Sequence, residues 1–361
     1  METVVGLMSG TSMDGVDAAA LTTDGATVAG HGPRHFRRYA EAERALLRAA
    51  LAEAPALGDR DARPGALADA ERMVTDANAE AVERLLAADP GLRPDLVGFH
   101  GHTVLHAPER RLTVQIGDGP ALAKRLGLPV VFDFRAADVA AGGEGAPLVP
   151  VYHRALVERA GLAGSVAVVN IGGVANLTRI GADGTLTAGD TGPGNALLDD
   201  FVRARTGAAM DRDGMLAARG TVDEAALARL LADPWFARPM PKSLDRDAFS
   251  AAAAAGLSTE DGAATLTAFT CRAIVKAIAM AGGADRVVPV GGGAANPTML
   301  AVLAAAGLGL TPAADLGWSA DFLEAEAFAF LAARSRRRLP LTFPGTTGVA
   351  APTTGGSFVR P

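Results

Sequence analysis

Cysteine and lysine are both scarce in this chain. Cys271 is the single cysteine among 361 residues, which excludes a disulfide bond within the chain. Because Cys271 lies in an apolar helical pattern, we expect a reduced thiol in a hydrophobic core. Lysine occurs only at positions 124, 242 and 276, whereas arginine and alanine abound, a bias that a GC-rich genome explains better than any function.

Long hydrophobic runs and a strong positive charge are also missing. No stretch of about 18 uncharged apolar residues occurs, so we expect no membrane-spanning helix. The chain does not open with a basic segment followed by an apolar one, so we expect no signal peptide and a cytoplasmic location. The net charge of −6 argues against nucleic acid as a partner. The short basic run 334–338 fits a helix end, where cations interact favourably with the helix dipole.

Two common nucleotide-binding motifs are absent as well. The chain has no Gly-x-x-x-x-Gly-Lys-Ser/Thr segment, which excludes a P-loop. No Gly-x-Gly-x-x-Gly segment follows the first expected strand, which excludes a Rossmann fingerprint. We therefore expect any nucleotide to be held between two domains rather than on one loop.

The length and the apolar content predict two domains. Apolar residues make up 49% of the chain, which is enough for substantial cores, and 361 residues are too many for one ordinary core. Residues 3–38 are expected to form three strands, and the strands expected at 166–171, 174–180 and 185–188 repeat that plan. Helices and further strands follow each set, which indicates an α/β fold with a mixed sheet in each half. The Gly-rich segment 142–147 is expected to be a hinge.

Hydrophobic periodicity predicts the remaining elements. We expect strands at 95–99, 112–116, 129–132 and 286–290. Helices are expected at 40–53, 65–88, 119–126, 195–206, 223–231, 247–255, 260–282, 297–305 and 319–334. The tail 339–361, rich in Pro, Gly and Thr, is expected to be a loop.

The most informative segment is a polar turn between two apolar runs near the N-terminus. Residues 10–17 hold glycines, hydroxyls and two carboxylates within a short stretch. Glycines allow backbone N–H groups to approach a ligand, and consecutive N–H groups in a turn form a nest for an anion. The pattern predicts a phosphate site at the first hairpin of the fold.

Two further Gly-rich turns occur in the second half. Residues 189–195 follow an expected strand and lead into an expected helix, whose N-terminus could bind a phosphate beside the carboxylate of Asp190. Residues 291–296 join a strand to a helix, and their glycines allow flat contact with a nucleobase or ribose. Each turn alone could serve geometry only. The three together indicate that they surround one nucleotide.

The histidines at positions 100, 102 and 106 leave two interpretations open. His100 and His102 are two apart on an expected strand, would point the same way and could share a zinc ion, as a zinc hydrolase requires. No Cys, Asp or Glu at ligand spacing completes a tetrahedral set. We therefore favour histidines that donate hydrogen bonds to a polar ligand.

Charged residues near two element ends are candidate ligand contacts. Arg135 follows an expected strand and could bind a carboxylate in a bidentate manner. A structural ion pair with Asp133 or Asp138 is the alternative. Glu324 and Glu326 lie in an otherwise apolar helix, and we expect one of them to face the ligand and the other to face solvent.

Residues 8–17, from Met8 to Asp17, closely resemble the opening of the anhydro-N-acetylmuramic acid kinases. The resemblance covers nearly the whole chain in order, at residues 98–108, 115–119, 133–135, 170–176, 189–195, 241–243, 291–296 and 324–329. The family is part of the superfamily of sugar kinases, actin and 70-kDa heat-shock proteins. The resemblance implies two actin-like (ribonuclease H-like) domains with mixed sheets around an interdomain nucleotide cleft. It places one domain at 1–148 with 318–361 and the other at 149–317, and it implies a homodimer.

The resemblance also implies a reaction. ATP, water and 1,6-anhydro-N-acetylmuramic acid would give N-acetylmuramic acid 6-phosphate and ADP, in the recycling of bacterial murein. Asp190 would be the base that deprotonates a water attacking the anomeric carbon, and Mg²⁺ would assist phosphoryl transfer. An ordinary glycosidase needs a second carboxyl group to protonate the leaving oxygen, whereas here the γ-phosphoryl group would take the place of that proton.

The matching residues receive their roles from the resemblance. Contacts with the β- and γ-phosphates are implied for the first turn, which consists of Gly10, Thr11, Ser12, Met13, Asp14, Gly15, Val16 and Asp17. Within it, Asp14 and Asp17 would shape the turn or reach a metal through water. Contacts with further phosphate oxygens and with adenosine are implied for Gly192, Gly194, Asn195, Gly291, Gly292, Gly293 and Asn296. Contacts with the sugar are implied for His102, Thr103, Asp133, Glu324 and Arg135, the last on the lactyl carboxylate.

Two segments depart from the family pattern. The family often has Gln where this chain has His102, and its Lys-Ser-Thr-Gly-Arg segment is Lys-Ser-Leu-Asp-Arg at 242–246 here. Two alternatives stay open beside the zinc hydrolase. One is a kinase of the same fold that acts on another amino sugar, and the other is a nucleotide-driven regulatory protein.

Overall fold

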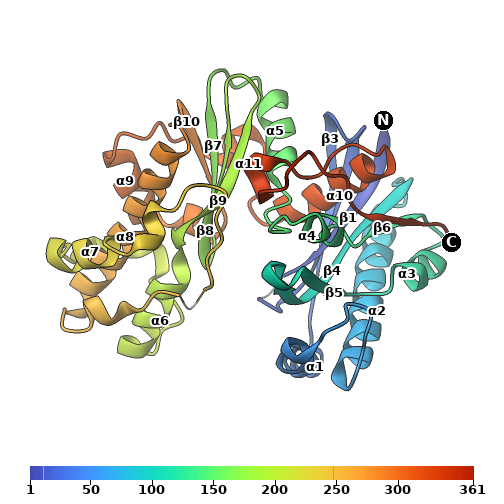
Figure 1. Cartoon of the computed structure of the whole chain (residues 1–361), viewed down its shortest axis with the longest axis horizontal. Coiled ribbons are helices and arrows are strands. Elements are labelled where there is room, and N and C mark those ends of the chain that lie inside the picture. Colours follow the sequence, from blue (N-terminus) through green and yellow to red (C-terminus); the bar gives the residue numbers. More distant parts are fainter. Residues whose placement is uncertain (11, 247) are drawn as a thin grey trace. The chain divides into compact units, whose positions relative to one another are not determined.

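The computed structural model describes residues 1–10, 12–246 and 248–361. The chain divides into two compact units, one of Met1–Arg159 with Asp321–Pro361 and the other of Ala160–Ala320 (Figure 1). The first unit therefore runs past the boundary expected at 148. The added segment is helix α5 (Pro150–Arg159), whose buried Tyr152 hydroxyl donates a 2.9 Å hydrogen bond to Glu326 of the same unit.

The first unit contains a mixed sheet. Its strand order is β11-β6-β4-β1-β2-β3, and β5 pairs with β4. The strands β1, β2 and β3 are antiparallel, whereas β4 is parallel to both β1 and β6. The bounds are β1 (Glu2–Ser9), β2 (Gly15–Thr23), β3 (Val28–Arg38), β4 (Leu96–Ala107), β5 (Leu112–Ile116), β6 (Val130–Phe132) and β11 (Ser357–Val359).

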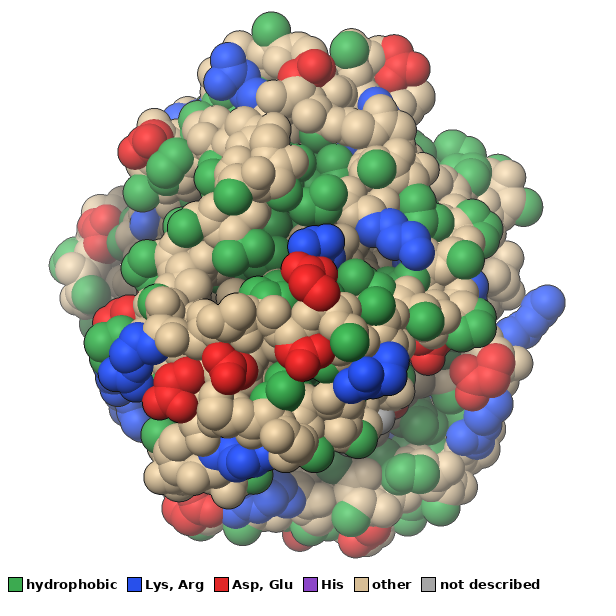
Figure 2. All heavy atoms as spheres, turned by 90° about the vertical axis from the view of Figure 1, so that its left-hand side faces the viewer, with side chains coloured by type: hydrophobic (Ala, Val, Ile, Leu, Met, Phe, Trp, Pro, Cys, Tyr) green, Lys and Arg blue, Asp and Glu red, His purple; other side chains and the backbone are tan. Residues whose placement is uncertain are grey.

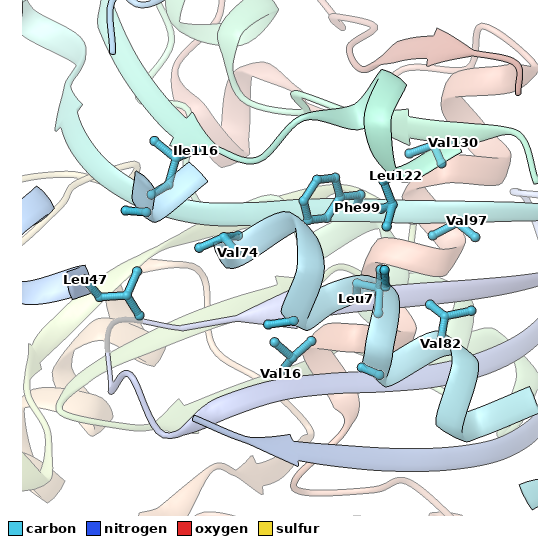
Figure 3. Packing of buried hydrophobic residues seen from close by; sticks show 14 of the residues in the cluster. Leu7, Val16, Leu47, Val74, Val82, Val97, Phe99, Ile116, Leu122 and Val130 are labelled. Atoms are coloured by element: carbon cyan, nitrogen blue, oxygen red, sulfur yellow. The ribbon is translucent and has the colours of Figure 1, made fainter. Parts of the chain in front are cut away.

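Helices cover both faces of this sheet. Helices α1 (Glu41–Glu53), α2 (Ala66–Ala88) and α3 (Gly119–Leu126) enclose the core drawn in Figure 3, where Leu7, Val97 and Phe99 point towards them. Helix α10 (Leu323–Arg336) packs on the opposite face, so closely that a Cβ atom on Gly6 or Gly98 would overlap its backbone. The shorter helices are α4 (Ala136–Ala140) and α11 (Pro344–Thr347).

The second unit repeats the part β4-β1-β2-β3 of the first sheet. Its sheet runs β10-β7-β8-β9, with β7, β8 and β9 antiparallel and β10 parallel to β7. The strands are β7 (Val166–Ile171), β8 (Val174–Ile180), β9 (Leu186–Pro193) and β10 (Arg286–Val290), and the helices are α6 (Asn195–Thr206), α7 (Glu224–Leu231), α8 (Thr259–Met280) and α9 (Pro297–Ala305). The prediction of an α/β fold with a mixed sheet in each half is confirmed.

Helix α8 is the core helix of the second unit. Its length and composition alone would allow it to cross a membrane, but 72% of its apolar window is buried inside the protein. Phe269 faces one hydrophobic cluster and Ile274 another. Cys271 is a buried free thiol, as expected from the apolar pattern around it. On the face of the molecule in Figure 2, acidic and basic side chains lie interspersed.

Several elements differ from the prediction. Strand β4 continues to Ala107, and β9 continues through residues 189–193, which we expected to form a turn. Of the helix expected at 247–255, residue 247 lies outside the described residues and the rest contains a single 3-10 turn, Ala251–Ala254. The segment 142–147 lies inside the first unit and not at a boundary between the units, and Gly145 donates to Asp138 and Glu144 to Thr347.

Candidate active site

A cavity of about 400 Å³ opens in the first unit at the ends of β1 and β4 and at the start of α10. It brings together Thr103, Arg135 and Glu324, three of the five predicted sugar contacts, with Gly10 and Ser12 of the first turn. The other lining residues are Met8, Ser9, His100, His106 and Ala146. The structure therefore joins the candidate sugar contacts and part of the candidate phosphate turn in one cavity.

The guanidinium of Arg135 is held firmly at the wall of this cavity. Its Nε and Nη2 atoms lie 3.2 and 3.0 Å from His100 Nε2, and its Nη1 atom donates a 2.8 Å bond to the carbonyl of Gly145. The ion pair with Asp133 or Asp138 that we left open is absent from the described residues. Asp133 instead pairs with Arg60 at 2.6 Å, and Asp138 accepts bonds from Gly145 and Thr347.

Two predicted sugar contacts do not line the cavity. Asp133 lies beside Arg60 along two other hollows of the first unit. His102 is completely buried and reaches the cavity only through Ser9, whose Oγ lies 2.9 Å from His102 Nδ1 and 2.9 Å from the Tyr39 hydroxyl. Burial lowers the pKa of His102 to about 4, so its ring is neutral at physiological pH.

A bulge in β4 separates the environments of the histidines. The pairing of β1 with β4 changes from Leu7 opposite Phe99 to Ser9 opposite His102, so β4 holds one extra residue at this point. Gly101, within the bulge, has a φ of +75°. His100 packs on Phe328 of α10 at 4.5 Å between ring centroids, whereas His102 bonds to Ser9. The assumption that both point the same way was wrong. His106 bonds to Thr113 and to the carbonyl of Glu144, and the described residues contain no group of three side chains placed to hold a metal.

The glutamates of α10 have different surroundings. Glu324 lines the cavity, as one of the pair was expected to do. Glu326 does not face solvent, because it is fully buried and accepts bonds from Arg34 and from Tyr152. Glu326 therefore stabilises the packing of α10 on its neighbours.

The first turn carries an acidic group at its end. The Met13 N–H donates to the Gly10 carbonyl at 3.0 Å, and the Ser12 hydroxyl donates to Asp14 at 2.7 Å. Partial burial, together with the negative charges of Asp14, Glu324 and Asp321, raises the pKa of Asp17 to about 7. Such a group favours a bound cation, which would relieve the repulsion. The Val16 side chain is part of the hydrophobic core, and Thr11 lies outside the described residues.

Asp190 lies in strand β9 of the second unit, not in a turn. Its backbone N–H donates to the carbonyl of Lys242 at 2.8 Å, and its carboxylate accepts a 2.7 Å bond from the N–H of Leu244. Burial raises the pKa of Asp190 to about 6, although that bond and the charge of Lys242 oppose the shift. The segment that departs from the family pattern at 244–245 therefore still holds the candidate base.

Lys242 is an unusual buried cation next to this carboxylate. Its side chain is 5% exposed, and its ammonium lies 4.0 Å from the centre of the Trp235 ring and 3.2 Å from the Trp235 carbonyl. Lysine is almost never buried without partners. Burial and the nearby Lys276 and Arg238 lower the pKa of Lys242 to about 8.

Gly194 and Asn195 do not present free N–H groups to a phosphate. The N–H groups of Gly194 and Asn195 already donate to the carbonyls of Gly173 and Gly172, and a Cβ on Gly194 would overlap Gly172. These contacts were not visible in the sequence because they join two separate turns. Gly192 lies within β9 with a φ of +148° and packs beside Phe236 and Ala273.

Sequence reasoning predicted the turn between β7 and β8 but gave its glycines no role in ligand binding. Gly172 and Gly173 occupy the same place in the second sheet as the first turn does in the first sheet. Across the described residues, neither of their N–H groups donates a hydrogen bond, so both remain available to an anion. The repeated strand order was the signal that could have identified them.

A second, smaller cavity of about 200 Å³ joins the predicted adenosine residues. Gly292, Asn296 and Asn195 line it together, and Asn195 donates to the carbonyl of Ile171 at 2.9 Å. Gly291 has a φ of +77°, and a Cβ there would overlap the Asn170 side chain, so glycine is required for the turn. Asn296 caps α9 by accepting a bond from Met299. The remaining lining residues are Leu198, Asp199, Met210, Asp211, Arg212, Asp213 and Ala295.

Comparison with known proteins identifies the family of the chain. The family model described as anhydro-N-acetylmuramic acid kinase matches residues 2–360. The chain belongs to this family. An anhydro-N-acetylmuramic acid kinase of Methylobacterium nodulans is 55% identical over 99% of both chains. One of Rhodopseudomonas palustris (strain BisB18) is 56% identical over 99% of this chain and 100% of its own length.

Solved structures resemble the chain much more distantly. The activator of the 2-hydroxyisocaproyl-CoA dehydratase from Clostridium difficile is 10% identical, with a TM-score of 0.43 over 93% of this chain and 96% of its own. A ROK family glucokinase from Streptomyces griseus is 13% identical, with a TM-score of 0.39 over 91% of this chain and 99% of its own. The description of the fold therefore rests on the strand order given above.

Proposed function

We propose that this protein is an ATP-dependent kinase of 1,6-anhydro-N-acetylmuramic acid that acts in murein recycling. It opens the anhydro ring with water and phosphorylates O6, which gives N-acetylmuramic acid 6-phosphate and ADP. The observation that carries the proposal is the match to this family over residues 2–360, with relatives at about 55% identity along the full chain.

Asp190 is the proposed general base. With a pKa of about 6, most of its carboxylate is ionised at neutral pH yet basic enough to accept a proton from water. The bond from the Leu244 N–H fixes one carboxylate oxygen and leaves the other for the water. As the proton leaves the water, its oxygen attacks the anomeric carbon, and the released O6 attacks the γ-phosphorus of ATP.

The cavity of the first unit is the proposed sugar site. Thr103 and Glu324 can exchange hydrogen bonds with sugar hydroxyl and amide groups, since the cavity offers both a hydroxyl and a carboxylate. Arg135 supplies a cation for the lactyl carboxylate. The proposal no longer includes Asp133, which is paired with Arg60, and it gives His102 only an indirect role through Ser9.

ATP and Mg²⁺ are the proposed cofactors. The first turn and the free N–H groups of Gly172 and Gly173 are proposed to bind phosphates, and the cavity at Gly292 and Asn296 to bind adenosine. Asp14 and Asp17 suit a hard cation that keeps several waters, as Mg²⁺ does, because both present carboxylate oxygens. The ion would neutralise the charge that develops on the phosphates.

Two further parts of the proposal come from the family alone. The protein is proposed to be a cytoplasmic homodimer. Sedimentation of the purified chain would measure its mass in solution, and fractionation of the bacterium would locate the enzyme.

An isotope experiment tests the reaction. The purified protein is incubated with ATP, Mg²⁺ and 1,6-anhydro-N-acetylmuramic acid in ¹⁸O-labelled water. The product is then reduced at its anomeric carbon and analysed by mass spectrometry. Oxygen at a free anomeric carbon exchanges slowly with water, so the product is reduced with borohydride at early times, before this exchange alters the label. We expect one ¹⁸O in the product for each ADP released; an unlabelled product or ATP turnover without sugar would reject the proposal.

A further inference from the structure

Arg135 is a cation without a counter-ion. It is half-buried at the cavity wall, and within the described residues no carboxylate lies at ion-pair distance from it. Glu324 and Asp138 act on it only at longer range. Removing a guanidinium from water is costly unless an anion or several acceptors replace the water. Arg135 therefore has no carboxylate in direct contact with it, and a ligand could supply one.

His100 is the residue that orients this guanidinium. An arginine can only donate hydrogen bonds, so His100 Nε2 must accept the bonds from Nε and Nη2. The proton of the neutral ring is then on Nδ1, which donates to the Gly101 carbonyl at 3.0 Å. The Gly101 bulge thus sets the tautomer of His100, and packing on Phe328 fixes the ring.

Protonation of His100 would destroy this arrangement, because a ring with two N–H groups cannot accept a bond from Arg135. The ring is 3% exposed. Burial, with the charge of Arg135 next to it, holds the pKa of His100 well below its usual range. The ring therefore remains an acceptor over the physiological pH range.

The bonds to His100 and Gly145 use three of the five N–H groups of Arg135. We infer that His100 positions Arg135 so that its two remaining N–H groups select ligands with a carboxylate over neutral sugars. The inference rests on the proposed function, in which this cavity holds the sugar. Its ligand class is an anhydro amino sugar with an anionic ether substituent, and His100 is a positioning residue because it reaches that substituent only through Arg135.

Binding measurements with two matched ligands test the inference. The ligands are 1,6-anhydro-N-acetylmuramic acid and its methyl ester, which differ in charge at one carboxyl group. We expect the wild-type protein to bind the acid about 10–100-fold more tightly than the ester, as for a charge-assisted hydrogen bond. In His100→Phe, which keeps a ring against Phe328 but removes the acceptor, the ratio of the two dissociation constants should fall towards one.

Two further variants separate orientation from general damage. His100→Gln retains an acceptor oxygen and should restore part of the preference for the acid. His153→Phe removes another buried imidazole, which does not line the cavity, and should keep the wild-type ratio. Equal affinity of the wild type for acid and ester would overturn the inference, as would a full preference in His100→Phe.

The result is distinguishable from a failure of the proposed function. A wild-type protein that phosphorylates the anhydro sugar but binds acid and ester equally would overturn only the role of His100 and Arg135. A wild-type protein that discriminates between the ligands but does not turn over the acid with ATP would overturn the kinase assignment and leave the carboxylate site standing.

Discussion

At the scale of single residues, the two units differ in how they hold their charged groups. In the second unit the carboxylate of Asp190 accepts a backbone bond from Leu244, and the Asp190 N–H donates to the carbonyl of Lys242. In the first unit Arg135 is fixed by a neutral imidazole and a carbonyl. Both arrangements leave part of a charged group free for a ligand, which is what a binding site or a general base requires.

Replacing Asp190 by asparagine tests the base. Asn keeps the size of the side chain and can still accept a bond from Leu244, but it cannot take a proton from water. We expect kcat to fall by about 10²–10⁴-fold. The dissociation constant of ADP, measured by calorimetry, should stay close to the wild-type value, and near-normal turnover would contradict the assignment.

The pH dependence of the rate follows from the same carboxylate. The base works when ionised, so activity should fall as the pH drops below about 6, the pKa of Asp190. In Lys242→Met the nearby positive charge is lost, which raises the pKa of Asp190. The acid limb of kcat/KM should therefore move to higher pH. Lys124→Met removes an exposed lysine of the first unit and should leave the limb in place.

At the scale of elements, close packing of α10 on β1 and β4 depends on two glycines. A Cβ on Gly98 would overlap the backbone of Phe328, so Gly98→Ala must push the helix away from the sheet. We expect it to destabilise the first unit by about 1–3 kcal/mol, the usual cost of overpacking a core. Urea unfolding of the full chain, followed by fluorescence or circular dichroism, would measure the loss.

A matched glycine provides the control for that prediction. Gly30 lies in β3 of the same sheet, and a Cβ there would meet no atom within 4 Å. Gly30→Ala should therefore leave the urea midpoint unchanged or raise it slightly. A similar midpoint for Gly30→Ala and Gly98→Ala would show that the contact with α10 does not limit stability.

The elements also show what local sequence can and cannot predict. Apolar periodicity located the antiparallel strands and the long helices because their burial repeats along the chain. It missed β11, which exists because Phe358 and its neighbours pair with the distant strand β6. It also ended β9 before Asp190, since the glycines at 189 and 192 suggested a turn. In the structure the segment around Lys242 packs against Gly189, and the strand continues to Pro193.

Candidate site residues were predictable to a similar degree. Residue type identified Asp190, Arg135 and Glu324 as chemically capable groups. Their partners were not predictable, because the pairing of Asp133 with Arg60 and of Arg135 with His100 joins residues far apart in sequence. Tertiary contacts decided which charged residue is free for a ligand and which is only structural.

At the scale of the whole molecule, the repeated strand order gives each unit a turn with ligand-facing features and a cavity of its own. This division predicts separable kinetic effects. Gly292→Val should fill the small cavity of the second unit without strain, since a Cβ at Gly292 meets only the Asn195 side chain, at 3.6 Å. Arg135→Met should remove the free cation from the larger cavity of the first unit.

Steady-state kinetics with each substrate varied in turn would measure this separation. We expect Gly292→Val to raise the KM of ATP at least about tenfold, as for a lost ligand contact, and to leave the KM of the sugar near its wild-type value. Arg135→Met should do the reverse, because a lost charge-assisted bond costs about 1.5–3 kcal/mol of sugar binding. If both variants raised the two KM values equally, the damage would have spread through the fold, and the assignment of one ligand to each cavity would have to be abandoned.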